Sequence, residues 1–260
     1  MTILDQIINR KKAEVFAAKK SFPVDELKDT EFFSRPTVSL KHAVKNGSGI
    51  IAEFKRQSPS KGIINGRVSP EEVVPQYEKF GASAASVLTD QEFFGGNAAD
   101  IMSVRNKVNL PVLRKDFMID AYQFYEAKSM GADAVLLIAA CLSPAQVGEF
   151  ASLAKELHLD VLLEIHTEAE IQHYCKNVDL VGINNRNLKD FKVDLQHSVQ
   201  LKNSLPEDTV TVAESGIYSL EDFKFLKSQG FDGFLMGEFF MRNPDPGAAF
   251  GDFIRSVAAK

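Results

Sequence analysis

Residues 130–146, MGADAVLLIAACLSPAQ, contain one complete structural unit. Gly131 suits the left-handed position that follows the end of a helix. The apolar run AVLLIA is continuous rather than alternating, which is typical of a strand buried on both faces of a parallel sheet. Ser143 and Gln146, with Pro144 between them, then form a capping box. The stretch therefore predicts a helix end, a buried strand and a helix start in close succession.

The same unit recurs along the 260-residue chain. Equivalent helix-end glycines are Gly81 and Gly230, and further capping boxes begin at Ser69 and Thr167, with Asp120 and Gln123 as a close variant. The expected strands are GIIAEF (49–54), AASVLT (84–89), LPVLRK (110–115), AVLLIA (134–139), DVLLEI (160–165), LVGIN (180–184), VTVAE (210–214) and GFLMG (233–237). Eight units match a (β/α)8 TIM barrel, a fold of about 250 residues. A doubly wound open sheet is the alternative, but it usually has fewer strands.

Residues 1–47 stand outside this pattern. Apolar side chains near helical spacing predict an amphipathic N-terminal helix: Leu4, Ile7, Ile8, Val15 and Phe16. A short helix is expected within SLKHAVKNG (39–47), and no Gly/Ser-rich linker separates it from the rest. We predict one domain over residues 1–260, with residues 1–47 as a helical extension packed on a barrel of residues 48–260.

The composition, 45% hydrophobic and 25% charged, is that of a soluble globular protein. The net charge of -5 disfavours nucleic acid or an anionic membrane as a partner. The N-terminus lacks the apolar core of a signal peptide, and no run reaches the roughly 18 residues of a membrane helix. Cys141 and Cys175 are expected to be reduced core thiols of a cytoplasmic protein. Four histidines are expected at the surface: His42, His158, His173 and His197.

Polar residues gather at the C-terminal ends of the expected strands: Glu53, Lys55, Thr89, Lys115, Glu164, Asn184 and Glu214. Barrel enzymes build their active sites on that face. Because side chains alternate along a strand, Glu53 and Lys55 share one face, whereas Arg114 and Lys115 do not. The alternative is a set of strand-end charges that reach solvent or form structural ion pairs. Their convergence from several strands favours a site, since buried charges are costly unless paired or used.

Two loop glycines predict an anion site. Gly216 and Gly237 directly follow the last two strands, where backbone N–H groups often hold phosphate in barrels. A metal site is not predicted, because Glu164 and His166 share a strand face but lack a third ligand at suitable spacing. Cys141 lacks an evident histidine partner and is expected to fill the core.

Six motifs together resemble the indole-3-glycerol phosphate synthase family: IIAEFKRQSPSKG (50–62), VLRKDF (112–117), LLEIH (162–166), GINNRNL (182–188), VAESGI (212–217) and LMGE (235–238). The resemblance runs from the N-terminal helix to about residue 245, and only Gln57 and Glu238 depart from the residues the family more often carries. It implies a carboxy-lyase of tryptophan biosynthesis without a cofactor. Its substrate would be 1-(2-carboxyphenylamino)-1-deoxyribulose 5-phosphate, a small phosphorylated molecule that loses carbon dioxide and water as the indole ring closes.

The resemblance also implies roles for individual residues. Lys115 would be the acid at the ketone oxygen, while Lys55 and either Glu53 or Glu164 would supply the second acid and the base. Asn184 completes the catalytic set. We expect the pKa of a lysine acid to be lowered, by a second ammonium group or by burial.

The implied substrate-binding residues are Ser58, Lys61, Phe117, Leu136, Arg186, Glu214 and Leu235. The implied phosphate-binding residues are Lys55, Ser215, Gly216, Gly237 and Glu238, the last through its backbone. The expected assembly is a monomer, with a weak homodimer as the alternative. Two other functions stay open: a Schiff-base lyase of a phosphosugar that uses Lys115 or Lys55 as nucleophile, and a non-catalytic phosphate-binding barrel.

Overall fold

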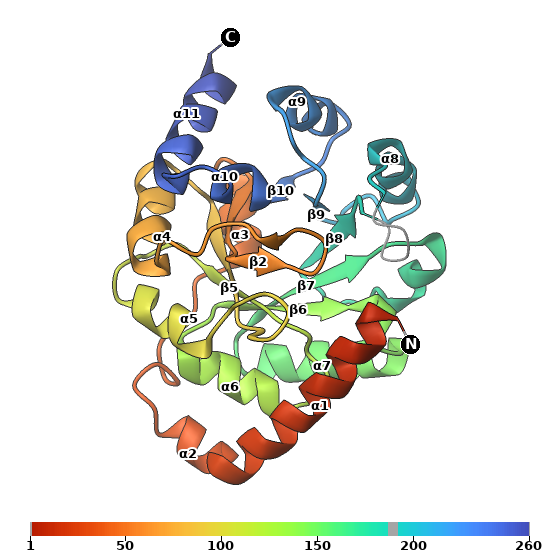
Figure 1. Ribbon diagram of the computed structural model, residues 1–260. Coiled ribbons are helices and arrows are strands. Elements are labelled where there is room, and N and C mark those ends of the chain that lie inside the picture. Colours follow the sequence, from red (N-terminus) through yellow and green to blue (C-terminus); the bar gives the residue numbers. More distant parts are fainter. Residues whose placement is uncertain (1, 187–191, 260) are drawn as a thin grey trace.

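Eight parallel strands close into a barrel in the computed structural model, which describes residues 2–186 and 192–259 (Figure 1). The strands are hydrogen-bonded in the order β1-β10-β9-β8-β7-β6-β5-β4, and β1 pairs with both β10 and β4. Their bounds are β1 Ile50–Phe54, β4 Ala84–Leu88, β5 Val112–Lys115, β6 Ala134–Ile138, β7 Asp160–Ile165, β8 Leu180–Asn184, β9 Thr211–Glu214 and β10 Gly233–Met236. The predicted (β/α)8 barrel is confirmed and the open sheet is wrong.

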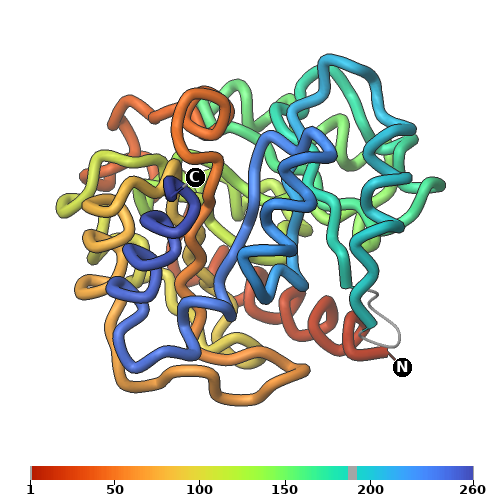
Figure 2. Tube along the Cα trace, turned by 90° about the horizontal axis from the view of Figure 1, so that it is seen from above, coloured from red at the N-terminus to blue at the C-terminus, as the bar shows by residue number. Residues whose placement is uncertain are grey.

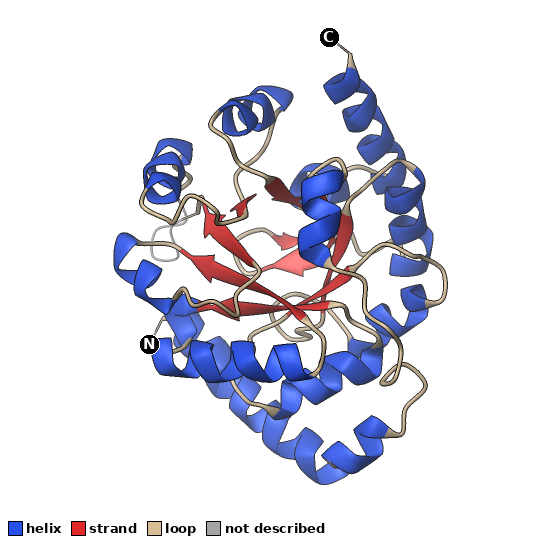
Figure 3. Ribbon diagram, turned by 180° about the vertical axis from the view of Figure 1, so that it is seen from behind, coloured by secondary structure: helices blue, strands red, loops and turns tan. Residues whose placement is uncertain are grey.

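Helices surround the barrel on the outside (Figure 3). They are α4 Pro70–Lys79, α5 Ala98–Arg105, α6 Tyr122–Met130, α7 Pro144–Glu156, α8 Leu195–Asn203, α9 Leu220–Ser228, α10 Glu238–Met241 and α11 Pro246–Ala258, with the 3-10 helices η1 Ala139–Cys141 and η2 Glu168–His173. The capping boxes at Ser69, Ser143 and Thr167 are all present. Gly81, Gly131 and Gly230 have φ of +93°, +89° and +79°, the left-handed conformation predicted for them.

The inside of the barrel changes from apolar to charged along four of its strands. Apolar side chains from several strands form one buried cluster inside it: Ile51, Leu113, Leu136, Leu162, Leu180, Val212 and Leu235. Because side chains alternate, the residue two positions later points the same way. On four strands that next inward residue is charged: Glu53, Lys115, Glu164 and Glu214. The alternation therefore fills one end of the barrel with apolar side chains and gathers charge at the other.

The N-terminal extension contacts both ends of the barrel. It contains α1 Ile3–Ser21, α2 Val24–Lys28 and α3 Leu40–Asn46. Leu40 and Val44 of α3 join the apolar cluster at the N-terminal ends of the strands. Figure 2 shows α1 (red) at the opposite end, together with the hairpin formed by β2 Gln57–Ser58 and β3 Gly62–Ile63. In the described part of the chain, no helix is long and apolar enough to cross a membrane.

The face that α1 buries contains most of the expected residues and one unexpected residue, Lys11. Phe16 is 62% exposed, while Ile7, Lys11 and Val15 are buried at a spacing of four residues. The Lys11 ammonium lies 3.0 Å from Asp90 and 2.9 Å from Asp116, so ion pairs compensate its burial. Of the five predicted apolar residues, only Phe16 is exposed, and the apolar spacing could not indicate Lys11 because a lysine carries no apolar signal.

His173 is buried rather than at the surface. Its Nε2 lies 2.9 Å from the carbonyl oxygen of Leu142 and its Nδ1 lies 3.0 Å from that of Glu170. The ring therefore joins η2 to the loop before α7. His42, His158 and His197 are exposed, as expected.

Candidate active site

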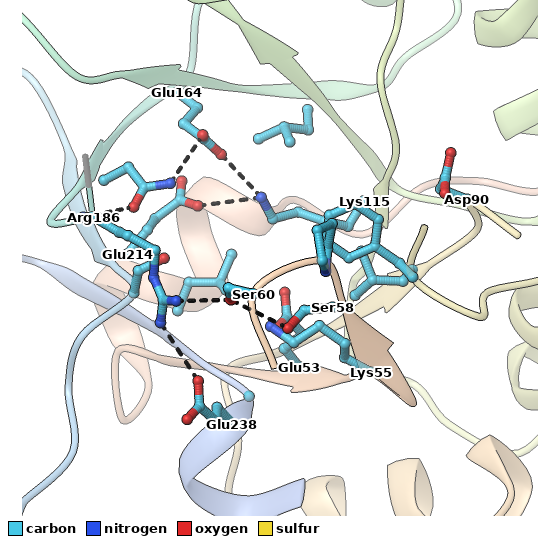
Figure 4. Close-up of a pocket in the computed structure, with 18 of the residues that line it drawn as sticks. Glu53, Lys55, Ser58, Ser60, Asp90, Lys115, Glu164, Arg186, Glu214 and Glu238 are labelled. Atoms are coloured by element: carbon cyan, nitrogen blue, oxygen red, sulfur yellow. Dashed lines mark hydrogen bonds and ion pairs between the residues drawn. The ribbon is translucent and has the colours of Figure 1, made fainter. Parts of the chain in front are cut away.

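The C-terminal ends of the strands surround a cavity of about 200 Å³ (Figure 4). Its wall contains nearly all of the predicted site residues: Glu53, Lys55, Ser58, Lys115, Phe117, Leu136, Glu164, Asn184, Arg186, Glu214, Ser215, Gly216, Leu235, Gly237 and Glu238. Lys61 is half exposed and lies outside this wall, with its ammonium 3.5 Å from a Glu238 oxygen. The last two residues of the GINNRNL motif, Asn187 and Leu188, lie outside the described residues.

Lys115 lies among carboxylates. Its Nζ is 3.0 Å from Glu164 Oε2 and 3.4 Å from Glu214 Oε2, and both contacts are drawn in Figure 4. Burial disfavours the ammonium, but the carboxylates of Glu164, Glu214 and Glu53 outweigh burial and raise the pKa of Lys115. The expectation of a lowered lysine pKa is therefore wrong for Lys115, because the attraction of the acids around it exceeds the cost of burial.

Glu164 is held as a carboxylate. Burial opposes its ionisation, but the Lys115 ammonium, the nearby His166 ring and a hydrogen bond from Asn184 hold the pKa of Glu164 well below its usual range. Asn184 Nδ2 donates to Oε1 at 3.1 Å, whereas Lys115 takes Oε2. Each carboxylate oxygen thus has its own partner, which fixes the orientation of the group.

Glu214 differs from Glu164, because its surroundings favour the protonated form of its carboxyl group. It is 1% exposed, and its Oε1 has no hydrogen-bond partner among the described residues. Burial, reinforced by the nearby charges of Glu164 and Glu53, raises the pKa of Glu214 to about 8. Gly182 on β8 makes room for this side chain, since a Cβ there would collide with the carboxylate. Three acids around one buried ammonium therefore leave Glu214 protonated near neutral pH.

Glu53 and Lys55 point to the same side, as the alternation of side chains along the strand predicts. Both side chains line the cavity, and Lys55 Nζ lies 2.5 Å from Glu53 Oε1. Arg114 faces the other way, toward α6, where it pairs with Glu126 at 2.6 Å. The prediction that only one of Arg114 and Lys115 faces the site is confirmed.

Arg186 spans the rim of the cavity. Its guanidinium donates to Ser60 Oγ at 2.9 Å and to the Tyr218 hydroxyl at 2.8 Å, and lies 3.5 Å from Glu238 Oε2 (Figure 4). Ser60 belongs to the turn between β2 and β3, so Arg186 ties this hairpin to the opposite rim. Glu238 directs its side chain toward Arg186 and Lys61, and its backbone begins α10.

The loop after β9 has an unusual backbone conformation, and the loop after β10 lies close to the site. Ser215 and Gly216 have φ of +64° and +70°, two consecutive left-handed residues. Asn185 Nδ2 donates to the Ser215 carbonyl oxygen at 2.7 Å and holds the turn. Gly237 lies so close to Glu53 that a Cβ would collide with it. Both predicted glycines therefore have a steric reason to be glycine, beyond loop formation.

One wall of the cavity is apolar. The predicted residues Phe117, Leu136 and Leu235 are there, and Phe94 adds a ring 6.1 Å from that of Phe117. Several further residues line the cavity that were not predicted as site residues: Ile3, Leu4, Ile7, Ser60, Asp90, Phe94 and Tyr218. The amphipathic spacing of α1 signalled that Ile7 is buried, but nothing local indicated that it is buried over the site.

The two cysteines are free and half-buried. Burial, with the nearby charges of Glu164 and Glu170, raises the pKa of Cys141 to about 12, so its thiol stays protonated. Among the described residues, no three His, Cys, Asp or Glu side chains are grouped so that they could hold a metal ion.

A closed barrel with acids and ammonium groups facing one another at the C-terminal ends of its strands defines the class: a (β/α)8-barrel enzyme equipped for proton transfer. Comparison with known proteins gives the particular family. The family model described as Indole-3-glycerol phosphate synthase matches residues 4–253, and the chain belongs to this family. Members of the family are carboxy-lyases of tryptophan biosynthesis.

Individual relatives agree over nearly the full length. The chain is 48% identical to the indole-3-glycerol phosphate synthase of Bacteroides thetaiotaomicron, over 98% of both chains. It is 42% identical to that of Acinetobacter baumannii, over 96% of this chain and 94% of the other. A solved structure titled "Structural study of Project ID from Aquifex aeolicus VF5" covers 84% of this chain and 96% of its own at a TM-score of 0.58; at 11% identity it supports the fold alone.

Proposed function

We propose that this cavity closes the indole ring of 1-(2-carboxyphenylamino)-1-deoxyribulose 5-phosphate, with Lys115 as the acid at the ketone oxygen. The observation that carries the proposal is the position of the Lys115 ammonium, 3.0 Å from Glu164 and 3.4 Å from Glu214, inside the cavity that the apolar wall and the loops after β9 and β10 share.

The two sides of the cavity bind different parts of the substrate. The phosphate lies against the loops of Ser215, Gly216 and Gly237, where backbone N–H groups reach it and Lys55 adds charge. The aromatic ring lies against Phe117, Leu136 and Leu235, which take it out of water. Arg186 pairs with the ring carboxylate, because a guanidinium matches a carboxylate in geometry and charge.

Ring closure begins when the ring carbon that bears the carboxylate attacks the ketone carbon. A carbon–carbon bond forms, and the electron pair of the carbonyl moves onto its oxygen. Lys115 donates a proton to this developing alkoxide, which is more basic than the amine, so a lysine of raised pKa still serves as the acid. Glu164 and Glu53 stabilise the positive iminium that results.

Two eliminations complete the reaction. The ring carboxylate leaves as carbon dioxide, and its bonding electrons neutralise the iminium. A base then removes the proton from the carbon next to nitrogen, and the hydroxyl group leaves as water with a proton from a second acid. Lys55 is positioned as that acid, and Glu53 or Glu164 as the base; their division of roles stays open.

The geometry argues against the two other functions. A Schiff-base lyase needs an unprotonated amine, and the surrounding carboxylates raise the pKa of Lys115, which keeps it charged. A barrel that only bound phosphate would have no use for three costly buried acidic side chains at its mouth.

The direct test supplies the carboxyphenylamino-deoxyribulose phosphate and follows indole fluorescence. The protein is expected to produce it, and Lys115→Met to lose about 10²- to 10⁴-fold in kcat, the usual contribution of a positioned acid. Inhibition by inorganic phosphate is expected to stay nearly unchanged. Lys12→Met, at an exposed position of α1, is the matched control. Near wild-type turnover by Lys115→Met would refute its assigned role.

A further inference from the structure

His166 lies directly behind the carboxylate of Glu164. It follows β7 by one residue and shares the inward face of Glu164, two positions earlier. Its side chain is 8% exposed, and its Nε2 lies 3.3 Å from Glu164 Oε1. On the other side, Nδ1 lies 3.8 Å from Glu170 Oε2. The imidazole is thus buried between two carboxylates, and the mechanism above gives it no part.

The contact with Glu164 is one of charge rather than of directed hydrogen bonding. Neither ring nitrogen has a hydrogen bond of good geometry among the described residues. A neutral ring would leave both nitrogens buried without a partner, which is costly, whereas an imidazolium is attracted by the two acids. The environment therefore favours the charged form.

Glu170 fixes the ring from the far side. One of its oxygens accepts from the backbone N–H of His166 at 2.5 Å and from that of Thr167 at 3.2 Å, as part of the capping box that begins η2. Other titratable groups nearby are His197 of α8, whose Nε2 lies 3.1 Å from the His166 carbonyl oxygen, and Cys141 of η1, whose pKa both acids raise. Of all these titratable groups, the two that face the imidazole nitrogens are Glu164 and Glu170.

The charge balance of the site favours a positive charge on His166. Three acidic side chains meet in the cavity, those of Glu53, Glu164 and Glu214, with Glu170 on the far side of His166, against two ammonium groups, those of Lys55 and Lys115. With Glu214 protonated, the carboxylates of Glu53, Glu164 and Glu170 still outnumber these ammonium groups by one. A positive charge at Glu164 Oε1 offsets this excess without occupying the cavity, because His166 does not line the wall.

We infer that His166, as an imidazolium, is a positioning residue that keeps Glu164 ionised and turned toward Lys115. The inference rests on the proposed function of Glu164. Burial disfavours the imidazolium, but Glu164 and Glu170 outweigh burial and raise the pKa of His166 to about 9. His166 therefore stays charged through the neutral range and loses its proton in mild alkali.

The test compares His166→Gln with His42→Gln, which changes the same residue type at an exposed position of α3. We expect His166→Gln to lower kcat by about 10- to 100-fold, as substitutions of groups that orient an active-site ligand do elsewhere, with KM changed by less than about twofold. The wild-type kcat is expected to fall in alkali as His166 deprotonates near pH 9, and this limb is expected to be missing in His166→Gln. His42→Gln should keep the wild-type profile.

A titration of the imidazole by NMR is independent of turnover. In the wild type the His166 ring is expected to titrate near pH 9, and in Glu164→Gln at a lower pH. Titration of the wild-type ring near its ordinary value of about 6.5, or a His166→Gln variant with wild-type kcat and alkaline limb, would overturn the inference. If His166→Gln does not fold, the NMR result decides. Failure of the wild type to form the indole product would refute the proposed function instead and would leave this titration unaffected.

Discussion

At the scale of single residues, the site depends on small side chains as much as on charged ones. Gly182 on β8 leaves the space that the Glu214 carboxylate occupies, and Glu214 in turn contacts Lys115. One oxygen of this buried acid has no hydrogen-bond partner among the described residues, which is costly. The position of Glu214 therefore depends on the space that the missing side chain of Gly182 leaves.

Gly182→Ala is therefore expected to displace Glu214 from Lys115. The added Cβ cannot be accommodated without moving either the carboxylate or the strand, so we expect kcat/KM to fall by about tenfold or more and the melting temperature to drop by several degrees. Gly148→Ala, in α7 with open space around the new methyl group, is the control. It is expected to be neutral or to stabilise by about 0.5–1 kcal/mol. Equal effects of the two substitutions would contradict this account.

Glu214 also predicts a pH dependence of stability. Its pKa is raised to about 8 on folding, so between its ordinary value and that pH the folded chain binds more protons than the unfolded chain. The free energy of unfolding must then decrease as the pH rises through this window. In Glu214→Gln this contribution is absent.

Chemical denaturation of the wild type and of Glu214→Gln, at about pH 5 and about pH 9, measures how the difference in their free energies of unfolding changes with pH. The stability of Glu214→Gln relative to the wild type is expected to increase with pH. Other titrating groups, including His166, are present in both proteins, so the comparison isolates Glu214. A relative stability that stays constant or decreases with pH would show that Glu214 is ionised in the folded protein.

At the scale of elements, α1 is attached to the barrel by a buried ammonium group. Lys11 is 4% exposed and contacts Glu14 at 2.8 Å, Asp90 at 3.0 Å and Asp116 at 2.9 Å. Burial opposes the charge of Lys11, but these acids outweigh burial and raise its pKa. The same helix contributes Ile3, Leu4 and Ile7 to the cavity wall. When α1 docks on the barrel, it therefore also completes the apolar wall of the cavity.

Lys11→Met is expected to loosen α1 without unfolding the barrel. Removing one partner of a buried ion pair costs about 3–5 kcal/mol, and here it leaves Asp90 and Asp116 without their shared cation. We expect faster hydrogen exchange in α1, unchanged protection in β4 and β5, and a raised KM. Lys12→Met, one position further along an exposed face, is the control. Unchanged exchange in α1 would show that apolar packing alone holds the helix.

At the scale of the whole molecule, we propose a monomer. In residues 2–186 and 192–259, the exposed large hydrophobic residues belong to α1 and its end, the segment before α3, the hairpin and α5: Phe16, Phe22, Val38, Ile63 and Met102. A stable interface buries about 1,200–2,000 Å² around an apolar centre, and scattered single residues do not supply one.

Analytical ultracentrifugation at micromolar concentration checks this proposal. The chain is expected to sediment as a 28.8 kDa species. A mass that rises toward twice this value with concentration would instead support the weak homodimer.

The sequence by itself determined the barrel and most of its chemistry. Continuous apolar runs, capping boxes and helix-end glycines are local signals, and eight repeats of one unit leave little choice of fold. Strand alternation also placed Glu53, Lys55, Lys115 and Glu164 correctly, because parallel strands bring their C-terminal ends to one face.

Only the tertiary structure decided which groups touch, and with that their charge states. The raised pKa of Lys115, the protonated state of Glu214 and the ion pairs of Lys11 depend on atoms that are far apart in the chain. The same holds for the α1 side chains over the cavity and for His166 behind Glu164. The physical reason is that electrostatic energy depends on distance and burial, which residue spacing along one element does not specify.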